Sequence, residues 1–232
     1  MDNYNLSLVI LLSLLFVLIF LTESRLELFD SNDRGVSGSE PKYNPQKWNK
    51  KFYKQSHNCY EYALNDLDDS DPSICKQHYR NCLENDYCDA NNTHMCRGIN
   101  LFSQPGFESG YSSPVGSEKT CKNYKMRTIK DNPDIYEVNS NEKRCKNGYN
   151  KIALVVDPGK YYHYYRQDSD GMWSHKPGRT RATNLDESGE LIYDPKTADR
   201  KVSDSMNYTD FCGYLCVPAN KTKKTIHSHD VK

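Results

Sequence analysis

The chain has 232 residues, and its 31 Lys and Arg balance its 31 Asp and Glu, so the formal net charge is zero. Zero net charge excludes a general nucleic-acid binder, because such a protein needs a basic surface to release counterions, and we expect no nucleic-acid partner. Hydrophobic residues are only 36% of the chain and partly lie in one N-terminal run, so the remaining core is small and needs a further staple.

The first predicted element is a hydrophobic helix over residues 8–21, which read LVILLSLLFVLIFL. Extended to residues 6–22, the apolar run is longer than the about 7–15 residues of a signal peptide's hydrophobic region and shorter than the about 20 of a membrane span. Residues 1–24 are therefore either an uncleaved signal anchor, which we favour, or a signal peptide cleaved after Ser24. Both alternatives deliver the body to the secretory lumen or the outside, either on a viral or host membrane held by residues 8–21 or as a secreted protein.

Nine cysteines support an oxidising compartment, in which most of them would pair. No two have the C-x-x-C spacing of zinc sites, and we expect neither a metal ion nor another cofactor. The odd count leaves at least one thiol over, and the others allow many connectivities, so the sequence assigns no bridge. The nine are Cys59, Cys75, Cys82, Cys88, Cys96, Cys121, Cys145, Cys212 and Cys216.

Three N-x-[ST] sequences in the body are candidate glycosylation sites, at Asn91, Asn207 and Asn220. Asparagines in this motif are modified in the secretory pathway, which agrees with the compartment that the cysteines indicate. A motif this short also recurs by chance in a chain rich in Asn, so it adds little by itself.

The domain begins after a polar stretch over residues 25–51, which we interpret as a linker because it holds glycines, prolines and few apolar residues. The domain itself spans residues 52–218. Asn58 is a good N-cap, so a helix is predicted from the next residue, and a second helix is predicted over residues 72–84. Residues 85–147 show little periodicity, and we interpret them as an irregular cysteine-rich insertion.

The clearest strand signals come in the second half of the chain. The β-branched run Lys151–Val156, the aromatic run Tyr161–Gln167 and the segment Met172–Lys176 are separated by turn residues, so they predict a three-stranded antiparallel meander. Phe211–Val217 is a short apolar strand that closes the domain, and residues 219–232 are a polar tail. The predicted fold class is therefore α+β, stapled by disulfides and preceded by one hydrophobic helix.

Cys59, His163 and His175 are the candidates for chemistry. Cys59 is expected at the start of a helix, where backbone N–H groups favour a thiolate and lower the pKa of the thiol. A hairpin that turns near Ser169 and Asp170 brings His163 close to His175, so one imidazole can accept the thiol proton while the other orients it. The structural alternatives are a disulfide for Cys59, a sheet histidine bonded to a tyrosine hydroxyl for His163, and a loop-edge histidine for His175.

Three large side chains near these histidines are candidates for substrate binding. Arg166 can bind a ligand, Tyr165 belongs to a tyrosine-rich run that can line a binding groove, and Trp173 can stack on a sugar or peptide. The alternative is packing, since a strand that is aromatic on both faces suits the centre of a sheet.

The order of these residues resembles the papain-like superfamily, in particular the NlpC/P60 and CHAP types of peptidases and amidases. The likeness rests on Asn58–Ala63, Tyr162–Arg166 and Trp173–His175. It implies a small papain-like domain in which Cys59 is the nucleophile, His163 the general base and His175 the orienting residue. The chain departs from that pattern in its long, cysteine-filled gap between Cys59 and His163, and in the residues that flank Cys59.

A second resemblance extends over the chain from Asn58 to Tyr214, through segments such as Gln104–Gly106, Tyr165–Asp168 and Trp173–Gly178. These segments look like a family of uncharacterised microbial and giant-virus proteins. That resemblance implies no activity.

Two hypotheses follow from the sequence. In the first, the chain is a membrane-anchored or secreted thiol hydrolase that cleaves an amide or peptide bond through an acyl-enzyme on Cys59. In the second, it is a non-catalytic, disulfide-rich surface or virion-envelope protein with a binding or structural role, in which the odd cysteine makes an intermolecular bridge. The sequence names neither the substrate nor the oligomeric state.

Overall fold

A computed structural model of the chain describes residues 12–17, 34–50, 53–54, 57–67 and 103–219. Residues 12–17 are helical, and no helix in these described ranges is both long and apolar enough to span a bilayer. Several predictions concern other parts of the chain and so lie outside the described residues: most of the helix over 8–21, the helix over 72–84, the polar tail, Asn91, Asn220, Cys75, Cys82, Cys88 and Cys96.

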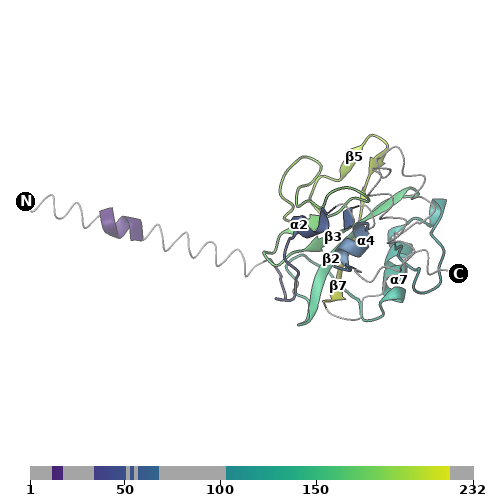
Figure 1. Cartoon of the computed structure of the whole chain (residues 1–232), viewed down its shortest axis with the longest axis horizontal. Coiled ribbons are helices and arrows are strands. Elements are labelled where there is room, and N and C mark those ends of the chain that lie inside the picture. The colour runs from purple at the N-terminus through teal and green to yellow at the C-terminus, as the bar shows by residue number, and fades with distance from the viewer. Residues whose placement is uncertain (1–11, 18–33, 51–52, 55–56, 68–102, 220–232) are drawn as a thin grey trace, which may run out of the picture.

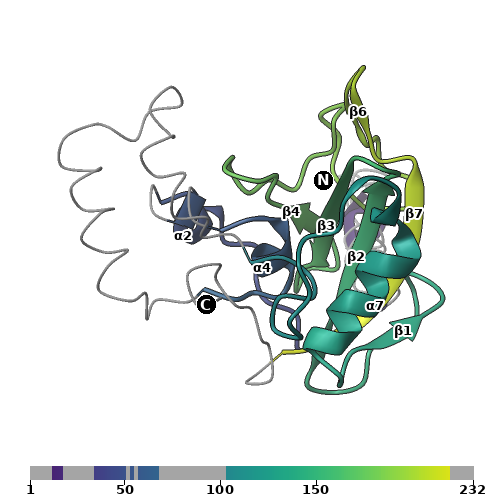
Figure 2. The same cartoon turned by 90° about the vertical axis from the view of Figure 1, so that its right-hand side faces the viewer.

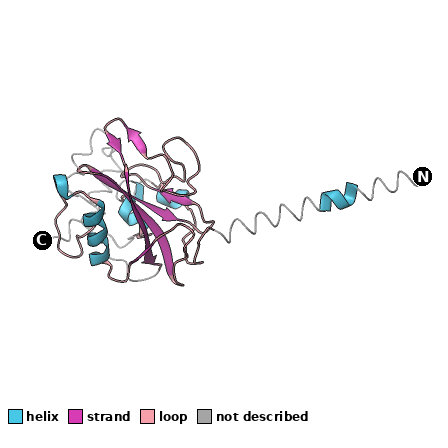
Figure 3. Cartoon of the chain, turned by 180° about the vertical axis from the view of Figure 1, so that it is seen from behind, coloured by secondary structure: helices cyan, strands magenta, loops and turns pink. Residues whose placement is uncertain are grey.

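The described chain combines short helices with an antiparallel sheet, which confirms the α+β class and the disulfide staples (Figures 1 and 3). A five-stranded sheet has the order β1-β7-β2-β3-β4, and a separate two-stranded sheet pairs β5 with β6. The elements are α2 (Pro45–Trp48), α4 (Cys59–Ala63), the 3-10 helix η1 (Gly116–Glu118), α7 (Cys121–Asp131), β1 (Tyr136–Val138), β2 (Tyr149–Asp157), β3 (Tyr161–Gln167), β4 (Trp173–His175), β5 (Lys201–Ser203), β6 (Met206–Asn207) and β7 (Asp210–Pro218).

The predicted meander is present as β2, β3 and β4, with antiparallel pairing throughout. Residues 152–157 of β2 face residues 161–166 of β3, and the turn between them lies at Pro158–Lys160. β4 is short and pairs only with Tyr165–Gln167, so the first half of β3 extends beyond it. This uncovered half of β3 is where the candidate site forms.

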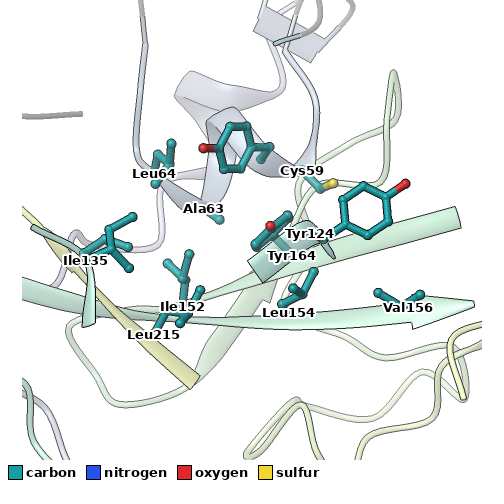
Figure 4. Packing of buried hydrophobic residues seen from close by; sticks show 12 residues of the cluster. Cys59, Ala63, Leu64, Tyr124, Ile135, Ile152, Leu154, Val156, Tyr164 and Leu215 are labelled. Atoms are coloured by element: carbon teal, nitrogen blue, oxygen red, sulfur yellow. The ribbon is translucent and has the colours of Figure 1, made fainter. Parts of the chain in front are cut away.

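Both α4 and α7 pack on one face of the sheet (Figure 2). Strand residues of a single parity, among them Ile152, Leu154 and Tyr164, meet Ala63 of α4 and Tyr124 of α7 in one buried cluster (Figure 4). Alternate residues of a strand point to opposite faces, so this parity defines the helical face of the sheet.

The opposite face of the sheet packs against the long segment between β4 and β7. Ala153 and Val155 of β2 and Trp173 of β4 contact Ile192 and Tyr208 there. The β5–β6 hairpin of this segment projects away from the five-stranded sheet (Figure 1). His163, which pairs with Val155, belongs to this second face by its register.

Two disulfides bond β7 to α7 and to the loop after β1. Cys121 at the start of α7 is bonded to Cys212, and Cys145 in the loop after β1 is bonded to Cys216. The bridges span 91 and 71 residues of sequence, and long loops are those whose closure restricts the unfolded chain most. They supply the staple that the low hydrophobic content predicts.

The predicted linker over residues 25–51 is wrong for its second part, because residues 34–50 pack on the domain. Trp48 of α2 is 2% exposed and meets Tyr62 edge to face. The buried Lys151 ammonium donates to the carbonyls of Gly35 and Asn141. Gly35 has a φ of +66°, and a Cβ there would lie 2.4 Å from the Asn141 oxygen, so only glycine allows this approach.

The predicted irregular insertion over residues 85–147 is also wrong for its second half, since α7 begins at Cys121 and runs through 11 residues. Thr120 caps it by accepting a hydrogen bond from the Asn123 N–H. Its sequence CKNYKMRTIKD has little apolar periodicity, so its stability comes from tertiary contacts, above all from buried Tyr124 and the Cys121–Cys212 bridge.

Candidate functional site

Cys59 is the first residue of α4, as the sequence predicts, and the helix start is held by a full capping box. The Asn58 side chain accepts from the backbone N–H groups of Tyr60 and Glu61, and the Glu61 carboxylate accepts from the Asn58 N–H at 2.7 Å. The Asn58 amide also donates to the Ser103 carbonyl at 2.7 Å. The cap therefore fixes the Cys59 backbone and links the start of the helix to the segment that contains Ser103.

The Cys59 thiol is free, and the residue is only 6% exposed. The expectation of a lowered pKa is wrong, because burial raises the pKa of this thiol to about 12. A backbone hydrogen bond from Tyr164 and the charge of Lys176 act in the opposite direction and are the smaller effects. The helix has five residues, so its dipole is too small to outweigh desolvation, and Cys59 rests as a neutral thiol.

His163 and His175 are brought together as the hairpin geometry predicts. The His163 Nε2 and His175 Nδ1 atoms are 2.8 Å apart, and both residues are buried. Tyr208 stacks on the His163 ring, Tyr165 stacks on the His175 ring, and the rings of Tyr165 and His163 meet edge to face. These aromatic contacts leave each imidazole little freedom to rotate.

The hydrogen bonds of the pair determine where its protons are. His175 Nε2 lies 3.0 Å from the Leu185 carbonyl oxygen, which can only accept, so His175 donates from Nε2. Burial lowers the pKa of His175 to about 4 and that of His163 well below its usual range, so both rings are neutral at pH 7. A neutral His175 must then accept at Nδ1 from His163 Nε2, and the Nδ1 of His163 keeps its lone pair. His163 is thus in the tautomer that a general base needs.

Cys59 and His163 line one pocket of about 500 Å³ beside the half of β3 that β4 leaves unpaired. Cys59 reaches it from the helical side, where its sulfur lies beside Tyr124 at the end of the core cluster (Figure 4). His163 reaches it from the other face, since neighbouring residues of a strand alternate. Further lining residues come from the segment before η1, the β2–β3 turn, the turn after β4, and the stretch from Met206 to Tyr208.

Gln104 also lines this pocket and was not predicted from the sequence. The Tyr162 hydroxyl donates to its Oε1 at 2.7 Å, which leaves the amide N–H groups of Gln104 as donors. The Cys59 N–H lies against its own sulfur, and a backbone hydrogen bond from it lowers the pKa of the thiol. The Cys59 N–H and the amide group of Gln104 are the kind of donors that stabilise a developing oxyanion. Gln104 lies in a stretch without periodicity, and the resemblance that includes Gln104–Gly106 implies no activity, so neither marked it as a site residue.

The three predicted substrate-binding residues are buried at 2% exposure or less and are not among the residues that line the pocket. Tyr165 packs against both histidines, and the Trp173 indole N–H donates to Asn141 at 3.1 Å. Arg166 forms a fully buried ion pair with Asp168 at 2.8 Å. None of the three faces the pocket, so the contacts that the structure gives them are packing and internal hydrogen bonds.

Arg166 belongs to a closed ring of hydrogen bonds. Its guanidinium donates to the Tyr62 hydroxyl at 3.1 Å and to Asp168. The Ser174 hydroxyl donates to the other oxygen of Asp168, so the 2.6 Å contact between Tyr62 and Ser174 has the tyrosine as donor. The ring joins α4, β3 and β4, which are the three elements that carry Cys59, His163 and His175.

Lys176, the last residue of the predicted strand Met172–Lys176, directly follows β4 and is buried. Its ammonium donates to the carbonyls of Lys54, His57 and Gly178, which use its three protons. Burial lowers its pKa to about 7, and the neighbouring Glu61 and Cys59 oppose this shift. Lys176 is the buried cation that acts on the Cys59 thiol.

Two further features of the sequence analysis concern glycosylation and metal binding. Asn207 is exposed at the end of β6, so its sequon is accessible to modification. Within the described residues, no three His, Cys, Asp or Glu side chains gather as a metal ligand set.

Comparison with known proteins finds a relative of known name. The chain is 34% identical to insoluble matrix shell protein 1 of Ruditapes philippinarum over 180 residues, which are 76% of this chain and 89% of the relative. No protein-family model matches the chain. No solved structure matches it either.

Proposed function

The chain belongs to the family of insoluble matrix shell protein 1, and from this we propose that it is a secreted, disulfide-stapled structural protein of an extracellular assembly. The relative's name carries this proposal, because it describes a component of an insoluble matrix. Two disulfides and an exposed sequon at Asn207 support a secretory route. Cys59 is free and buried in the structure, so we expect the intermolecular bridge of this structural role to use another cysteine.

Secretion of the full chain from cultured animal cells tests this role. We expect the protein in the extracellular fraction, with a part that resists extraction by neutral salt buffer. The Cys59→Ser variant should assemble as the parent does, since a structural role does not need this thiol. Retention of the parent in the cytosol as a fully reduced protein would contradict the proposal.

A second candidate function, thiol-dependent acyl transfer, is favoured by the pocket that Cys59 and His163 share. On this proposal a papain-like arrangement cleaves an amide or peptide bond. The Cys59 sulfur attacks the carbonyl carbon while its proton passes to His163 Nδ1, and the Cys59 and Gln104 N–H groups stabilise the oxyanion. The C–N bond then breaks, the amine leaves with the proton from His163, and water hydrolyses the thioester to release the acid and restore the thiol.

His175 acts in this scheme as a positioning residue. Its acceptor Nδ1 holds the proton of His163 on Nε2 and so keeps the basic lone pair on Nδ1. The Leu185 carbonyl in turn fixes the tautomer of His175. The chain of three groups resembles the nucleophile, base and orienter of thiol hydrolases.

A thiol-directed activity probe tests the second function. We expect a neutral acyl-mimicking electrophile to label Cys59 covalently in the purified chain, and the label to be absent from Cys59→Ala. His163→Ala should lower the labelling rate at least tenfold, because a general base contributes about 10²–10⁴ in rate. Labelling of the Cys59→Ala variant at the parent's rate would refute this function, and Cys121 and Cys212, which are bridged, serve as internal controls.

A further inference from the structure

The first half of β3 presents its edge to the pocket beside Cys59. Tyr161, Tyr162 and His163 are consecutive, and all three line this pocket. Because alternate side chains of a strand point to opposite faces of a sheet, three consecutive residues line one pocket where the edge of the strand lies against it. β4 pairs with β3 only from Tyr165 onward, so in the described part of the chain no neighbouring strand covers this edge.

The pairing of β3 with β4 determines which backbone groups point to the open edge. Directly after β3, the Asp168 N–H donates to the Met172 carbonyl at 2.8 Å, so residue 168 directs its backbone groups toward β4. The direction alternates along an antiparallel strand, and Tyr164 and Tyr162 therefore direct their backbone groups the same way. Those of His163, which lies between them, point to β2 instead.

Tyr164 and Tyr162 differ in what meets them at this edge. The Tyr164 backbone forms a hydrogen bond to the Cys59 thiol, so the sulfur takes the place that a neighbouring strand would have. Among the described residues, none forms a hydrogen bond with the backbone N–H or carbonyl of Tyr162, whose hydroxyl donates to Gln104. Tyr162 thus offers a backbone donor and a backbone acceptor side by side, next to the sulfur.

The turn after β4 keeps this edge open. Pro177 and Gly178 line the same pocket, and Lys176 holds the turn by donating to the Gly178 carbonyl. Pro177 has no N–H, so it cannot continue the ladder from β4 along β3. The line that β4 would follow past Tyr162 is therefore left to another chain.

We propose that the substrate of Cys59 is an extended peptide segment, bound as an added strand through the backbone N–H and carbonyl of Tyr162. This proposal rests on the second function above, acyl transfer at Cys59. An extended peptide has the complementary acceptor and donor, and the two hydrogen bonds hold it beside the sulfur. Its alternating side chains meet the tyrosine rings that line the pocket, which are Tyr124, Tyr161, Tyr162 and Tyr208.

A peptide series with single backbone replacements tests the proposal on the full chain. The parent probe is acetyl-Ala-Ala-Ala chloromethyl ketone, and the reference is chloroacetone, which has the same reacting group without a peptide. With both, the Cys59 sulfur displaces chloride, and the thiol proton passes to His163 or water. Three further probes each replace one amide by an ester, which removes one N–H. The rate of labelling at Cys59, located by mass spectrometry, is divided by the rate of the same reagent with a small thiol.

We expect the parent probe to label Cys59 at least about tenfold faster than chloroacetone on this scale. An ester should lower the rate about threefold to tenfold at the amide that donates to the Tyr162 carbonyl. At the amide next to it, whose N–H points away from β3, the rate should change less than about twofold. Equal losses at all three positions, or no loss at any, would overturn the proposal, because strand pairing has a period of two.

A backbone replacement in the chain itself identifies the residue at the edge. The α-hydroxy analogue of tyrosine at Tyr162 exchanges its N–H for oxygen and retains the side chain. We expect labelling by the parent probe, relative to chloroacetone, to fall about threefold to tenfold. The matched control is the same exchange at Lys122, an exposed residue in the first turn of α7, where N–H groups have no acceptor within the helix. It should keep the ratio of the unmodified chain, and an equal ratio in both variants would contradict the role of Tyr162.

The reference reagent separates this proposal from the one on which it rests. If chloroacetone labels Cys59 but the peptide has no advantage, peptide binding at the β3 edge is refuted and the thiol site remains. If neither reagent labels Cys59 in the folded chain, the thiol site is refuted and this proposal with it.

Discussion

The neutral Cys59 thiol and the neutral His163 imidazole form an unusual resting pair for a thiol enzyme. Burial raises the pKa of Cys59 to about 12 and lowers that of His163, so proton transfer between them is unfavourable in the empty pocket. On the proposed acyl-transfer function, a bound ligand supplies the stabilisation that creates the thiolate. Reactivity at this residue is therefore expected to depend on what occupies the pocket.

The resting state has a direct consequence for alkylation as a function of pH. We expect the rate of Cys59 labelling by iodoacetamide to rise steadily to above about pH 9, since the thiolate fraction grows until the pH reaches the pKa of the thiol. Rates on the full chain measured at several pH values check this. A rate that is flat from about pH 5 to 8 would show a preformed thiolate and contradict the assigned resting state.

The histidine pair also predicts how stability depends on pH. The pKa of His175 falls from 6.5 in the unfolded chain to about 4 in the folded one, so between these values the unfolded state binds more protons. Stability is thus full above pH 6.5 and falls as the pH drops toward 4, by about 2 kcal/mol at about pH 4.5 from His175 alone. Urea unfolding at about pH 7.5 and 4.5 measures the loss.

The His175→Gln variant is the control for that prediction. Carboxylates also titrate in this range, but their contribution is common to both proteins. The variant should lose about 2 kcal/mol less than the parent between the two pH values. An equal loss in both proteins would exclude the histidine as the cause.

Among the elements, α4, β3 and β4 are held in register by the ring of Arg166, Tyr62, Ser174 and Asp168. We predict that Arg166→Leu lowers the free energy of unfolding by about 3–5 kcal/mol, because it leaves the buried Asp168 carboxylate without its partner. Chemical denaturation measures this. Adding Asp168→Asn should recover part of the loss, and a double variant as unstable as the single one would contradict the ring's role.

The meander and the start of α4 could be predicted from the sequence because their signals are local. β2 is a β-branched run that ends at a turn, and Asn58 with Glu61 three residues later is a capping signature. The closeness of His163 and His175 followed from the hairpin alone. The state of the Cys59 thiol did not, because burial depends on residues far along the chain, among them Tyr124 and Tyr164.

The strand predicted at Phe211–Val217 is also present, within β7, whereas α7 and the packing of residues 34–50 could not be predicted because long-range contacts make them. α7 is polar and depends on a bridge to Cys212, 91 residues away. The packing of residues 34–50 depends on Lys151, a lysine inside an apolar strand that finds its acceptors at Gly35 and Asn141. A lysine in such a run has no partner in its own neighbourhood, so the sequence gives no sign of this contact.

For the whole molecule, the two disulfides contribute stability that the small hydrophobic core does not supply. We predict that Cys121→Ala with Cys212→Ala, and separately Cys145→Ala with Cys216→Ala, each lower stability by about 4 kcal/mol, on the chain-entropy estimate for such loops. Loops of 91 and 71 residues differ by only a few tenths of a kcal/mol on that basis. Calorimetry of both double variants checks this. If their losses of stability differ by more than about 2 kcal/mol, loop closure is not the main contribution of the bridges.

The measurement that tests the central claim most directly is a map of free and bridged cysteines in the purified, unreduced chain. Free thiols are alkylated after unfolding without reductant, and the bridges are identified by mass spectrometry of the digest. We predict bridges from Cys121 to Cys212 and from Cys145 to Cys216, with Cys59 as a free thiol. Cys59 found in a disulfide would contradict the site, and the structural role in an extracellular assembly would then remain.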